Sequence, residues 1–382
     1  MKITIDRDEL IAAAAPICSV ASGRNTIPSL DCILLQTQSD GTCLLVGYDL
    51  EKGIKTYLPC NIEEEGFFLL NATRFFQIIR TMPSGDVTIE INGKNCRTRI
   101  VGGSSVFELQ AHPGSDYPNL PEITSDRGFT MNQGELAKIL TKTAFAAAVN
   151  DPRPSLNGVF LKVEGSSITA VGCDGSRMSL CEETSDLVSL RNDGEALSFQ
   201  FIIPVKTAEE VIRLLGTDGN VTLRLGRKHI LFEIGVFTVF ARLVDVEYIQ
   251  YERFIPKTSS VFACVDRMQL LMSLERAMLV TEEKQQGQSK SPVILSFQKD
   301  GLDVSSTSVT GRVNDLIPIS LQGEPLEIGF NCRFLCEAIK ACEADMLKIS
   351  LSGPLAGMLV EPTEKEEGKR FMLLVLPVRL NQ

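Results

Sequence analysis

The sequence predicts an α+β protein built from three tandem domains of one fold, because two patterns recur along the chain. The first is an amphipathic helix whose apolar residues follow the helical spacing i, i+3, i+4 and i+7. Its copies lie about 130 residues apart, which is the size of a domain, and comprise Phe75, Ile78, Ile79 and Met82, then Ala208, Val211, Ile212 and Leu215, then Leu335, Ala338, Ile339 and Cys342. The second pattern is a strand-like run on each side of that helix: FFLL and DVTIEI, FII and NVTLRL, EIGF and MLKISL.

Each third of the chain also opens in the same way, with a short strand that leads into another helix. The three openings read ITIDRDEL, FTMNQGEL and ACVDRMQL. Asp6, Asn132 and Asp266 stand where each helix would begin, and their side chains can accept hydrogen bonds from free N–H groups of the first turn. The first of these helices is expected to run to about Ser22.

Short alternating runs between the helices predict antiparallel hairpins. Asp40-Gly41, Glu164-Gly165 and Asp300-Gly301 mark turns at matching places in the three copies. We therefore expect three domains, 1–126, 127–256 and 257–382, each with two helices and about eight strands in antiparallel sheets.

Three polar segments are expected to lie outside this framework. The Thr281–Pro292 segment is polar and lacks periodicity, which predicts a mobile loop. Glu361–Lys369 is typical of a solvated hairpin tip, and the acidic run 63–65 predicts an exposed turn.

The composition is that of an ordinary cytoplasmic protein. Apolar residues make up 44% and charged residues 23% of 382, no apolar run reaches the length of a membrane span, and the N-terminus resembles no secretory signal. The eleven cysteines are odd in number and form no CxxC pair, which indicates thiols in a reducing compartment. The net charge of −10 argues against a protein that coats nucleic acid with its whole surface, although a basic lining could lie within an acidic exterior.

The search for catalytic chemistry finds no site, so we expect no catalytic residues, cofactor or metal. The chain lacks the GxGxxG, GxxxxGK[ST], HExxH and GxSxG motifs. Cys332 and Cys336 lie one helical turn apart and could hold a soft metal, but buried apolar positions explain them better. Only two histidines, His112 and His229, are present for acid–base chemistry.

One charged position repeats with the helix. Arg80, Arg213 and Lys340 share a register on the side away from the apolar stripe. Burial explains a repeated apolar stripe, whereas a repeated cation indicates either a ligand or chance.

Several segments together resemble the bacterial sliding clamp family, the beta subunit of DNA polymerase III. The resemblance covers essentially the whole chain, and its motifs are specific as a set although each alone is weak. They are SGRNTIPSL (22–30), VGYDLE (46–51), YPNLP (117–121), RPSLNG (153–158), CDGSRM (173–178), IGFN (328–331) and LPVRL (376–380).

The resemblance implies a head-to-tail homodimer that closes a ring of six similar domains around double-stranded DNA. Helix-borne cations would touch phosphates without reading bases, so that the ring can slide. The candidate DNA contacts, each of which could instead be an ordinary solvated cation, are Arg24, Arg74, Arg80, Arg153, Lys206, Arg213 and Lys340. By the same resemblance, Phe107 and Leu109 on an edge strand would meet Met278 and Leu279 of the other chain.

The family also has an apolar cleft between its second and third domains. The cleft binds short peptides of the type Gln-Leu-x-Leu-Phe from the replicative polymerase, the clamp loader and repair proteins. Carried over position by position, its walls here would be Leu156, Cys173, Gly175, Ser176, Arg177, Met178, Ile249, Arg253, Phe254, Asn331, Phe334, Leu355, Leu376, Pro377, Val378 and Arg379. Leu374 and Val375 are better explained as core strand residues.

The chain departs from the family pattern in a few places. Ser176, Ile249 and Cys173 replace residues that are more often basic, proline and threonine, and Asn381 and Gln382 extend past the usual end. These changes leave open a diverged clamp paralogue with altered partners. An alternative of another class is an enzyme that binds a small anion at Arg24, Arg153 and Arg177.

Overall fold

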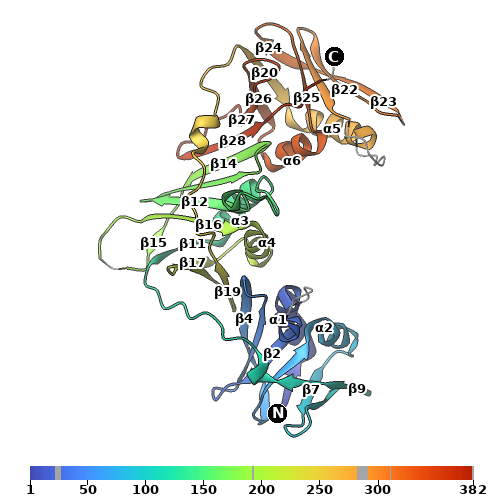
Figure 1. The fold of residues 1–382 in the computed structure, drawn as a ribbon, viewed down its shortest axis with the longest axis vertical. Coiled ribbons are helices and arrows are strands. Elements are labelled where there is room, and N and C mark those ends of the chain that lie inside the picture. Colours follow the sequence, from blue (N-terminus) through green and yellow to red (C-terminus); the bar gives the residue numbers. More distant parts are fainter. Residues whose placement is uncertain (22–26, 192, 282–290, 310, 381–382) are drawn as a thin grey trace. The chain divides into compact units, whose positions relative to one another are not determined.

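A computed structural model describes residues 1–21, 27–191, 193–281, 291–309 and 311–380 (Figure 1). It contains two compact units. Unit 1 comprises residues 1–134, 188–194 and 213–243, and unit 2 comprises residues 135–187, 195–212 and 244–382. The predicted loop at Thr281–Pro292 falls mostly outside the described residues, as does Arg24. The two units divide the middle third between them, so the three domain boundaries stay predictions.

Unit 1 contains two antiparallel sheets. The first has five strands in the order β5 (Asn61–Glu64), β1 (Lys2–Asp6), β7 (Asp86–Ile91), β8 (Arg97–Gly102) and β9 (Ser105–Gln110). The second has ten strands in the order β10 (His112–Pro113), β6 (Phe67–Asn71), β2 (Cys32–Thr37), β3 (Thr42–Tyr48), β4 (Lys52–Pro59), β19 (Phe237–Arg242), β18 (His229–Ile234), β17 (Asn220–Leu225), β11 (Gly128–Asn132) and β15 (Val188–Ser189).

Unit 2 also contains two antiparallel sheets. The larger has nine strands in the order β16 (Ser198–Pro204), β12 (Gly158–Glu164), β13 (Ser167–Cys173), β14 (Arg177–Thr184), β28 (Lys369–Val375), β27 (Met358–Pro362), β26 (Met346–Leu351), β20 (Val261–Asp266) and β24 (Ile319–Gln322). The smaller has four strands in the order β23 (Arg312–Ile317), β22 (Gly301–Thr307), β21 (Val293–Gln298) and β25 (Leu326–Phe330).

In the described part of the chain the helices occur in pairs, two in each third, as predicted. They are α1 (Arg7–Ala21), α2 (Ala72–Thr81), α3 (Gln133–Ala144), α4 (Val205–Leu214), α5 (Arg267–Thr281) and α6 (Cys332–Ala341). Within unit 1, α1 packs against α2 and against β3 and β4, and within unit 2, α5 packs against α6, β22 and β23 (Figure 1). Short 3-10 helices lie at η1 (Pro28–Asp31), η2 (Gly114–Asp116), η3 (Pro154–Leu156) and η4 (Tyr251–Phe254). Among the described residues, no helix is long and apolar enough to cross a membrane.

The sequence signals act locally as expected. Asp6 Oδ1 accepts the N–H groups of Asp8 and Glu9 at 2.9 and 3.1 Å, and Asp266 Oδ1 accepts that of Gln269 at 2.8 Å. The apolar stripe of α2 and that of α6 are buried, with Phe75 and Leu335 fully enclosed. The predicted α+β class is therefore confirmed.

One predicted turn is wrong. Residues 61–64 form the strand β5, which pairs with β1, although the run 63–65 is acidic. The strand lies at the edge of its sheet, where its acidic side chains stay exposed, and Lys2 Nζ lies 2.5 Å from Glu63 Oε2. An edge position therefore lets a charged run form a strand.

Strand pairing repeats three times. One run of strands has the orders β6-β2-β3-β4, β16-β12-β13-β14 and β25-β21-β22-β23. The other has the orders β5-β1-β7-β8-β9, β15-β11-β17-β18-β19 and β24-β20-β26-β27-β28. Each third of the chain thus contributes the same two runs, which confirms the internal repeat.

The last strands of these runs join successive thirds of the chain. In unit 1, β4 pairs with β19, and we call this contact the first joint. In unit 2, β14 pairs with β28, and we call this contact the second joint. The two other runs end in β9 and β23, which correspond to the strands that form the joints. Each of the two lies at the edge of its sheet in the described part of the chain.

Candidate functional site

The turn before β14 builds one end of the second joint. Asp174 Oδ1 accepts the N–H groups of Ser176 and Arg177 at 2.8 and 2.9 Å, which fixes the turn. Gly175 adopts φ +90°, a left-handed conformation that glycine accommodates without strain. The carbonyl of Ser176 then accepts the N–H of Leu376 at 2.8 Å, so the turn is tied to the C-terminal segment.

Beneath this turn lies an apolar cluster that draws on both the middle and the last third of the chain. Leu156, Cys173, Met178 and Leu374 belong to it and are each at most 8% exposed, and Ile249 packs against it. Within the sheet, Met178 faces Leu374 across the β14–β28 pairing. The structure thus brings together five residues that are far apart in sequence, four of them predicted as walls of a cleft.

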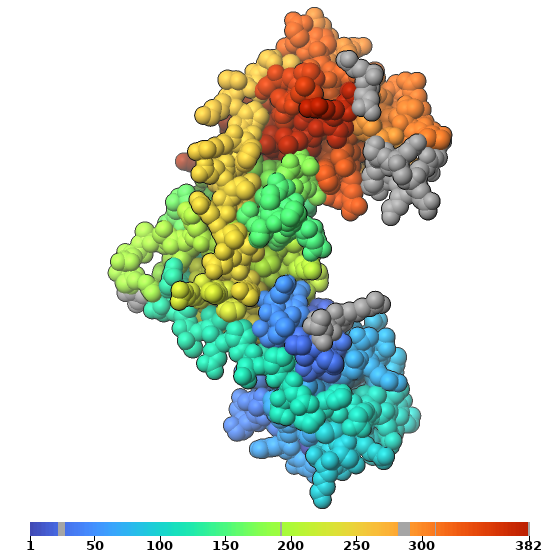
Figure 2. Space-filling view, viewed as in Figure 1, coloured from blue at the N-terminus to red at the C-terminus, as the bar shows by residue number. Residues whose placement is uncertain are grey.

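Apolar side chains also remain exposed around this cluster. Phe254 is 61%, Leu355 73%, Leu376 44% and Val378 36% exposed. Leu376 lies close to Gly357, because a Cβ there would stand 3.1 Å from Leu376 Cδ2. Phe254 ends η4, in the 244–260 segment that runs along the surface of unit 2 beside the red C-terminal segment (Figure 2). Contiguous exposed apolar groups are typical of binding surfaces, and all four of these residues were predicted as walls of the cleft.

The C-terminal segment continues from the cluster toward α6. The Val378 N–H donates to the Gly329 carbonyl at 2.9 Å, two residues before the α6 cap Asn331. Asn331 Oδ1 accepts the N–H of Phe334 at 3.3 Å. These contacts extend the predicted wall along α6, with Pro377 half-buried and Arg253 and Arg379 exposed.

Arg177 differs from the other predicted wall residues because its charged group is enclosed. Its side chain is 8% exposed. The guanidinium donates to Asp174 Oδ2 at 3.1 Å, to Glu337 Oε2 at 2.6 Å and to the Phe145 carbonyl at 2.7 Å. Its planar face lies 4.4 Å from the ring centre of Phe334.

The repeated cations occupy equivalent places. Arg80, Arg213 and Lys340 are exposed and lie in the last turns of α2, α4 and α6. Lys340 Nζ is 2.8 Å from Glu275 Oε1, and this hydrogen bond raises the pKa of Lys340. A phosphate would therefore compete with Glu275 for this ammonium group.

The other candidate DNA contacts in the described residues belong to different segments of the chain. Lys206 is exposed in the first turn of α4. The Arg153 guanidinium makes two hydrogen bonds to Asp151, at 2.9 and 3.0 Å, and lies beside Gly175 of the turn in the second joint. Arg74 of α2 lines one hollow of about 980 Å³ together with Leu109 of the edge strand β9.

The residues predicted to join two chains lie at or beside two edge strands, β9 and β23. Phe107 is 38% exposed on β9, beside Leu109. Leu279 is 78% exposed on α5, which packs against the edge strand β23, and Met278 is half-buried beside it. Both edges therefore present apolar groups to solvent.

Comparison with known proteins matches the chain along nearly its whole length. Family models of the DNA polymerase III beta subunit match at residues 1–121 (N-terminal domain), 130–250 (central domain) and 252–379 (C-terminal domain). The chain belongs to the DNA polymerase III beta subunit family. The beta sliding clamp of Vibrio cholerae is 27% identical over 384 residues and covers 100% of both chains.

Solved structures of beta subunits agree with this assignment. The DNA polymerase sliding clamp of Bacillus subtilis superposes with a TM-score of 0.89 at 27% identity, and that of Pseudomonas aeruginosa with 0.87 at 26%. Each match covers 100% of both chains. The three tandem domains expected from the internal repeat, and the clamp fold that the family resemblance implied for them, are thereby confirmed.

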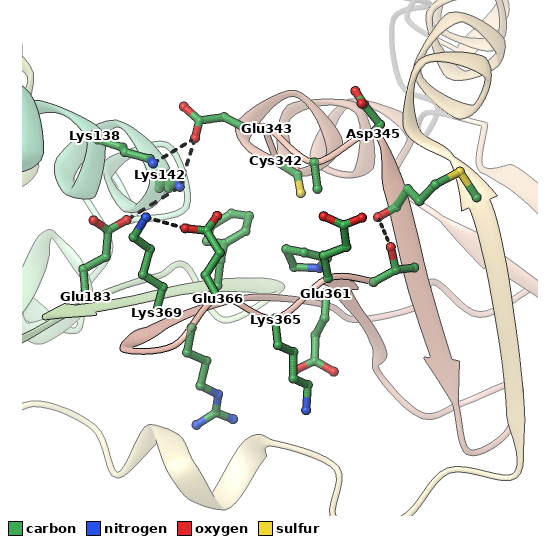
Figure 3. Close-up of a pocket in the computed structure, with 17 residues that line it drawn as sticks. Lys138, Lys142, Glu183, Cys342, Glu343, Asp345, Glu361, Lys365, Glu366 and Lys369 are labelled. Atoms are coloured by element: carbon green, nitrogen blue, oxygen red, sulfur yellow. Dashed lines mark hydrogen bonds and ion pairs between the residues drawn. The ribbon is translucent and has the colours of Figure 1, made fainter.

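A charged cavity next to the second joint was not predicted from the sequence. Its volume is about 520 Å³, and Figure 3 shows lysines from α3 facing glutamates from β14 and from the segment after α6. Lys142, only 8% exposed, lies 3.2 Å from Glu343 and 3.8 Å from Glu183, and Lys138 lies 3.3 Å from Glu343. Burial raises the pKa of Glu343, but the two lysines outweigh it and lower the pKa. The spacing of Lys138 and Lys142 by one helical turn was the one available signal.

Proposed function

We propose that two copies of this chain close a ring around double-stranded DNA and hold a replicative polymerase on it. The ring acts as a mobile tether in the cytoplasm, where the chromosome lies, and carries out no catalysis of its own. The observation that carries this proposal is that β9 and β23, which end their runs as β19, β28, β4 and β14 end theirs, are edge strands in the described part of the chain.

The joint rule predicts how the second copy binds. β4 pairs with β19 and β14 with β28, so β23 is left to pair with β9 of another chain. A head-to-tail contact of this kind forms twice in a dimer and closes the ring. The exposed apolar residues Phe107 and Leu279 on these two edges support the pairing.

The DNA contacts in this proposal are electrostatic and independent of base sequence. Arg80, Arg213 and Lys340, at the ends of equivalent helices, would contact phosphates, as would Arg24, Arg74, Arg153 and Lys206. The net charge of −10 is compatible with this role, because a closed ring is retained by topology and needs only weak attraction.

The apolar surface at the second joint would bind short peptides of partner proteins. Burial of one leucine or phenylalanine side chain contributes about 1.5–3 kcal/mol. Two or three such anchors contribute about 3–9 kcal/mol before the cost of ordering the peptide, so micromolar affinity, about −8 kcal/mol, is the upper bound that these anchors set. Such peptides would exchange, so the polymerase, the clamp loader and repair proteins could share one cleft.

The dimer contact can be tested by Leu279→Asp. A carboxylate in the apolar edge should separate the chains, and light scattering should report the mass of a monomer. Val236→Asp is the matched control, because Val236 is 70% exposed in the turn between β18 and β19, away from both edges. A dimer mass for the Leu279 variant contradicts the proposed contact.

Ring topology can be tested on DNA. The protein is placed by a clamp loader and ATP on a nicked circular plasmid, and retention is measured by gel filtration before and after linearisation. A ring slides off the ends, so retention should fall after the cut. Equal retention on circular and linear DNA would refute the encircling model.

A further inference from the structure

Arg177 connects three parts of the second joint through one guanidinium group. Its guanidinium donates to Asp174, to the carbonyl of Phe145 after α3 and to Glu337 of α6. Asp174 is the residue that fixes the turn at residues 174–176. Hydrogen bonds that involve ionised groups are among the strongest in proteins, and a planar guanidinium also fixes direction. Arg177 therefore sets the distance between the turn and α6.

Glu337 is held from two sides. Its Oε1 accepts from Arg333 at 2.8 Å and its Oε2 from Arg177 at 2.6 Å. Burial raises the pKa of Glu337, but these two hydrogen bonds outweigh it and lower the pKa, so the carboxylate is the favoured form. Arg333 is largely exposed, whereas Arg177 is enclosed, so the contact with Arg177 is the one inside the joint.

The two segments that this guanidinium contacts hold residues predicted for the walls of the cleft. Ser176 and Gly175 belong to the turn that Asp174 fixes, and Phe334 and its cap residue Asn331 belong to the start of α6. The ring of Phe334 packs on the guanidinium face at 4.4 Å, and that of Phe145 lies at 5.2 Å. Little of Arg177 is left to contact a ligand, since its side chain is 8% exposed.

We propose that Arg177 is a positioning residue that sets the width of the peptide cleft through Glu337 and Phe334, and that it is not a peptide ligand. The proposal rests on the proposed function, because it assigns a role within the same cleft. Its consequence is that Glu337, which was not among the predicted cleft residues, controls peptide affinity as strongly as Arg177 does.

The test compares Arg177→Lys, Glu337→Gln and the double variant in the full-length protein. A fluorescein-labelled peptide, Gln-Leu-Ala-Leu-Phe, is titrated and its anisotropy recorded at a temperature well below the unfolding midpoint of every variant. Each single substitution should weaken binding about tenfold, because each removes a charged hydrogen bond. The double variant should be no weaker than the weaker single variant, since both substitutions break the same contact.

Arg333→Gln is the matched control, because it removes the other hydrogen bond to Glu337 and leaves the contact with Arg177 in place. Its peptide affinity should stay within about twofold of the original protein. The dependence of affinity on salt should be the same for all variants, because the proposal includes no charge contact between Arg177 and the peptide.

The outcomes separate the two proposals. If Glu337→Gln binds as the original protein does while Arg177→Lys does not, Arg177 contacts the peptide and the positioning role is wrong. If both single variants bind as the original does, the positioning role is also wrong, while the cleft itself stands. If the original protein binds no peptide, the proposed cleft fails and the positioning role fails with it.

Discussion

The two joints within the chain have the same backbone and different contents. In the first joint, Asp49 Oδ1 accepts the N–H groups of Glu51 and Lys52, as Asp174 does for Ser176 and Arg177 in the second. The N–H of Arg242 donates to the Glu51 carbonyl at 2.8 Å, just as that of Leu376 donates to Ser176. The framework is therefore shared down to single hydrogen bonds.

The side chains at these matched positions differ. In the first joint Gly53 faces Phe240, whose ring centre lies 5.4 Å from that of Tyr48. In the second joint Met178 faces Leu374, and Cys173 stands in the place of Tyr48.

The residues that follow differ as well. The first joint continues into the exposed Arg242, whereas the second continues into the half-exposed Leu376. At these matched positions the first joint therefore has an aromatic pair and a charge, and the second has aliphatic side chains, although the second joint's cluster also contains the stacked rings of Phe160 and Tyr248 at 4.7 Å.

The largest effect on stability is expected from a substitution in the first joint. Phe240→Ala should destabilise unit 1 by about 3–5 kcal/mol, because the ring is 3% exposed and packs directly on Gly53. Calorimetry at fixed protein concentration should show an earlier transition, and peptide binding at the second joint should persist in the folded protein. A loss of less than about 1 kcal/mol in the free energy of unfolding would show that the aromatic pair is not what distinguishes the joints.

Much of the fold could be predicted from the sequence because local physics determines it. The helical stripes around Phe75 and Leu335 and the caps at Asp6 and Asp266 act through neighbours in the chain. The turn predicted at the acidic run 63–65 was wrong, because an edge position lets a charged run form a strand. Whether a strand lies at an edge depends on the order of strands in the sheet and not on composition.

The contents of the joints could not be predicted in the same way. The contact between Arg177 and Glu337 spans 160 residues, and nothing in either local sequence indicates the other. The cleft residues were named through the family resemblance, which transfers positions and not contacts. The resemblance placed Arg177 in the wall, whereas the structure gives its guanidinium three protein partners.

Exchange of the matched residues tests which joint binds peptide. Leu376→Arg gives the second joint the residue of the first and should weaken peptide binding by about 10- to 100-fold, since one apolar anchor contact is lost. Thermal stability should hardly change, because Leu376 is 44% exposed. Anisotropy titration measures the affinity.

Arg242→Leu is the reciprocal control. It should create no peptide binding at the first joint, because Phe240 and Tyr48 still fill the space beneath. A second, saturable peptide site in the Arg242 variant would mean that the exposed residue, and not the buried aromatic pair, decides whether a joint is open.

Acid should affect the second joint through Glu337. Its pKa lies below the ordinary value of 4.5, since burial raises it but hydrogen bonds from Arg333 and Arg177 lower it further. The stabilisation that the Glu337 carboxylate gives the folded protein is therefore complete above its pKa in the unfolded chain. It is lost as pH falls through the lower pKa of Glu337 in the folded protein. Peptide affinity should decline below about pH 4.5 in the original protein, and this decline should be shallower in Glu337→Gln. Parallel profiles for the two proteins would assign the decline to other carboxylates.

The smallest effect concerns the matched turns. Leu50 has φ +75° where the second joint has Gly175 at φ +90°, so the first joint holds a branched residue in a left-handed conformation. That conformation costs about 1–2 kcal/mol for an L-residue. Glycine avoids this cost, but it gives the unfolded chain more conformational freedom, which lowers stability by about 0.4–1 kcal/mol. Leu50→Gly should therefore stabilise unit 1 by about 0.5 kcal/mol in calorimetry. The opposite exchange, Gly175→Leu, should destabilise unit 2, because the φ of +90° at this position costs an L-residue about 1–2 kcal/mol. Equal and opposite shifts would show that the turn is interchangeable, whereas a loss of stability in both variants would show that each turn is adapted to its own joint.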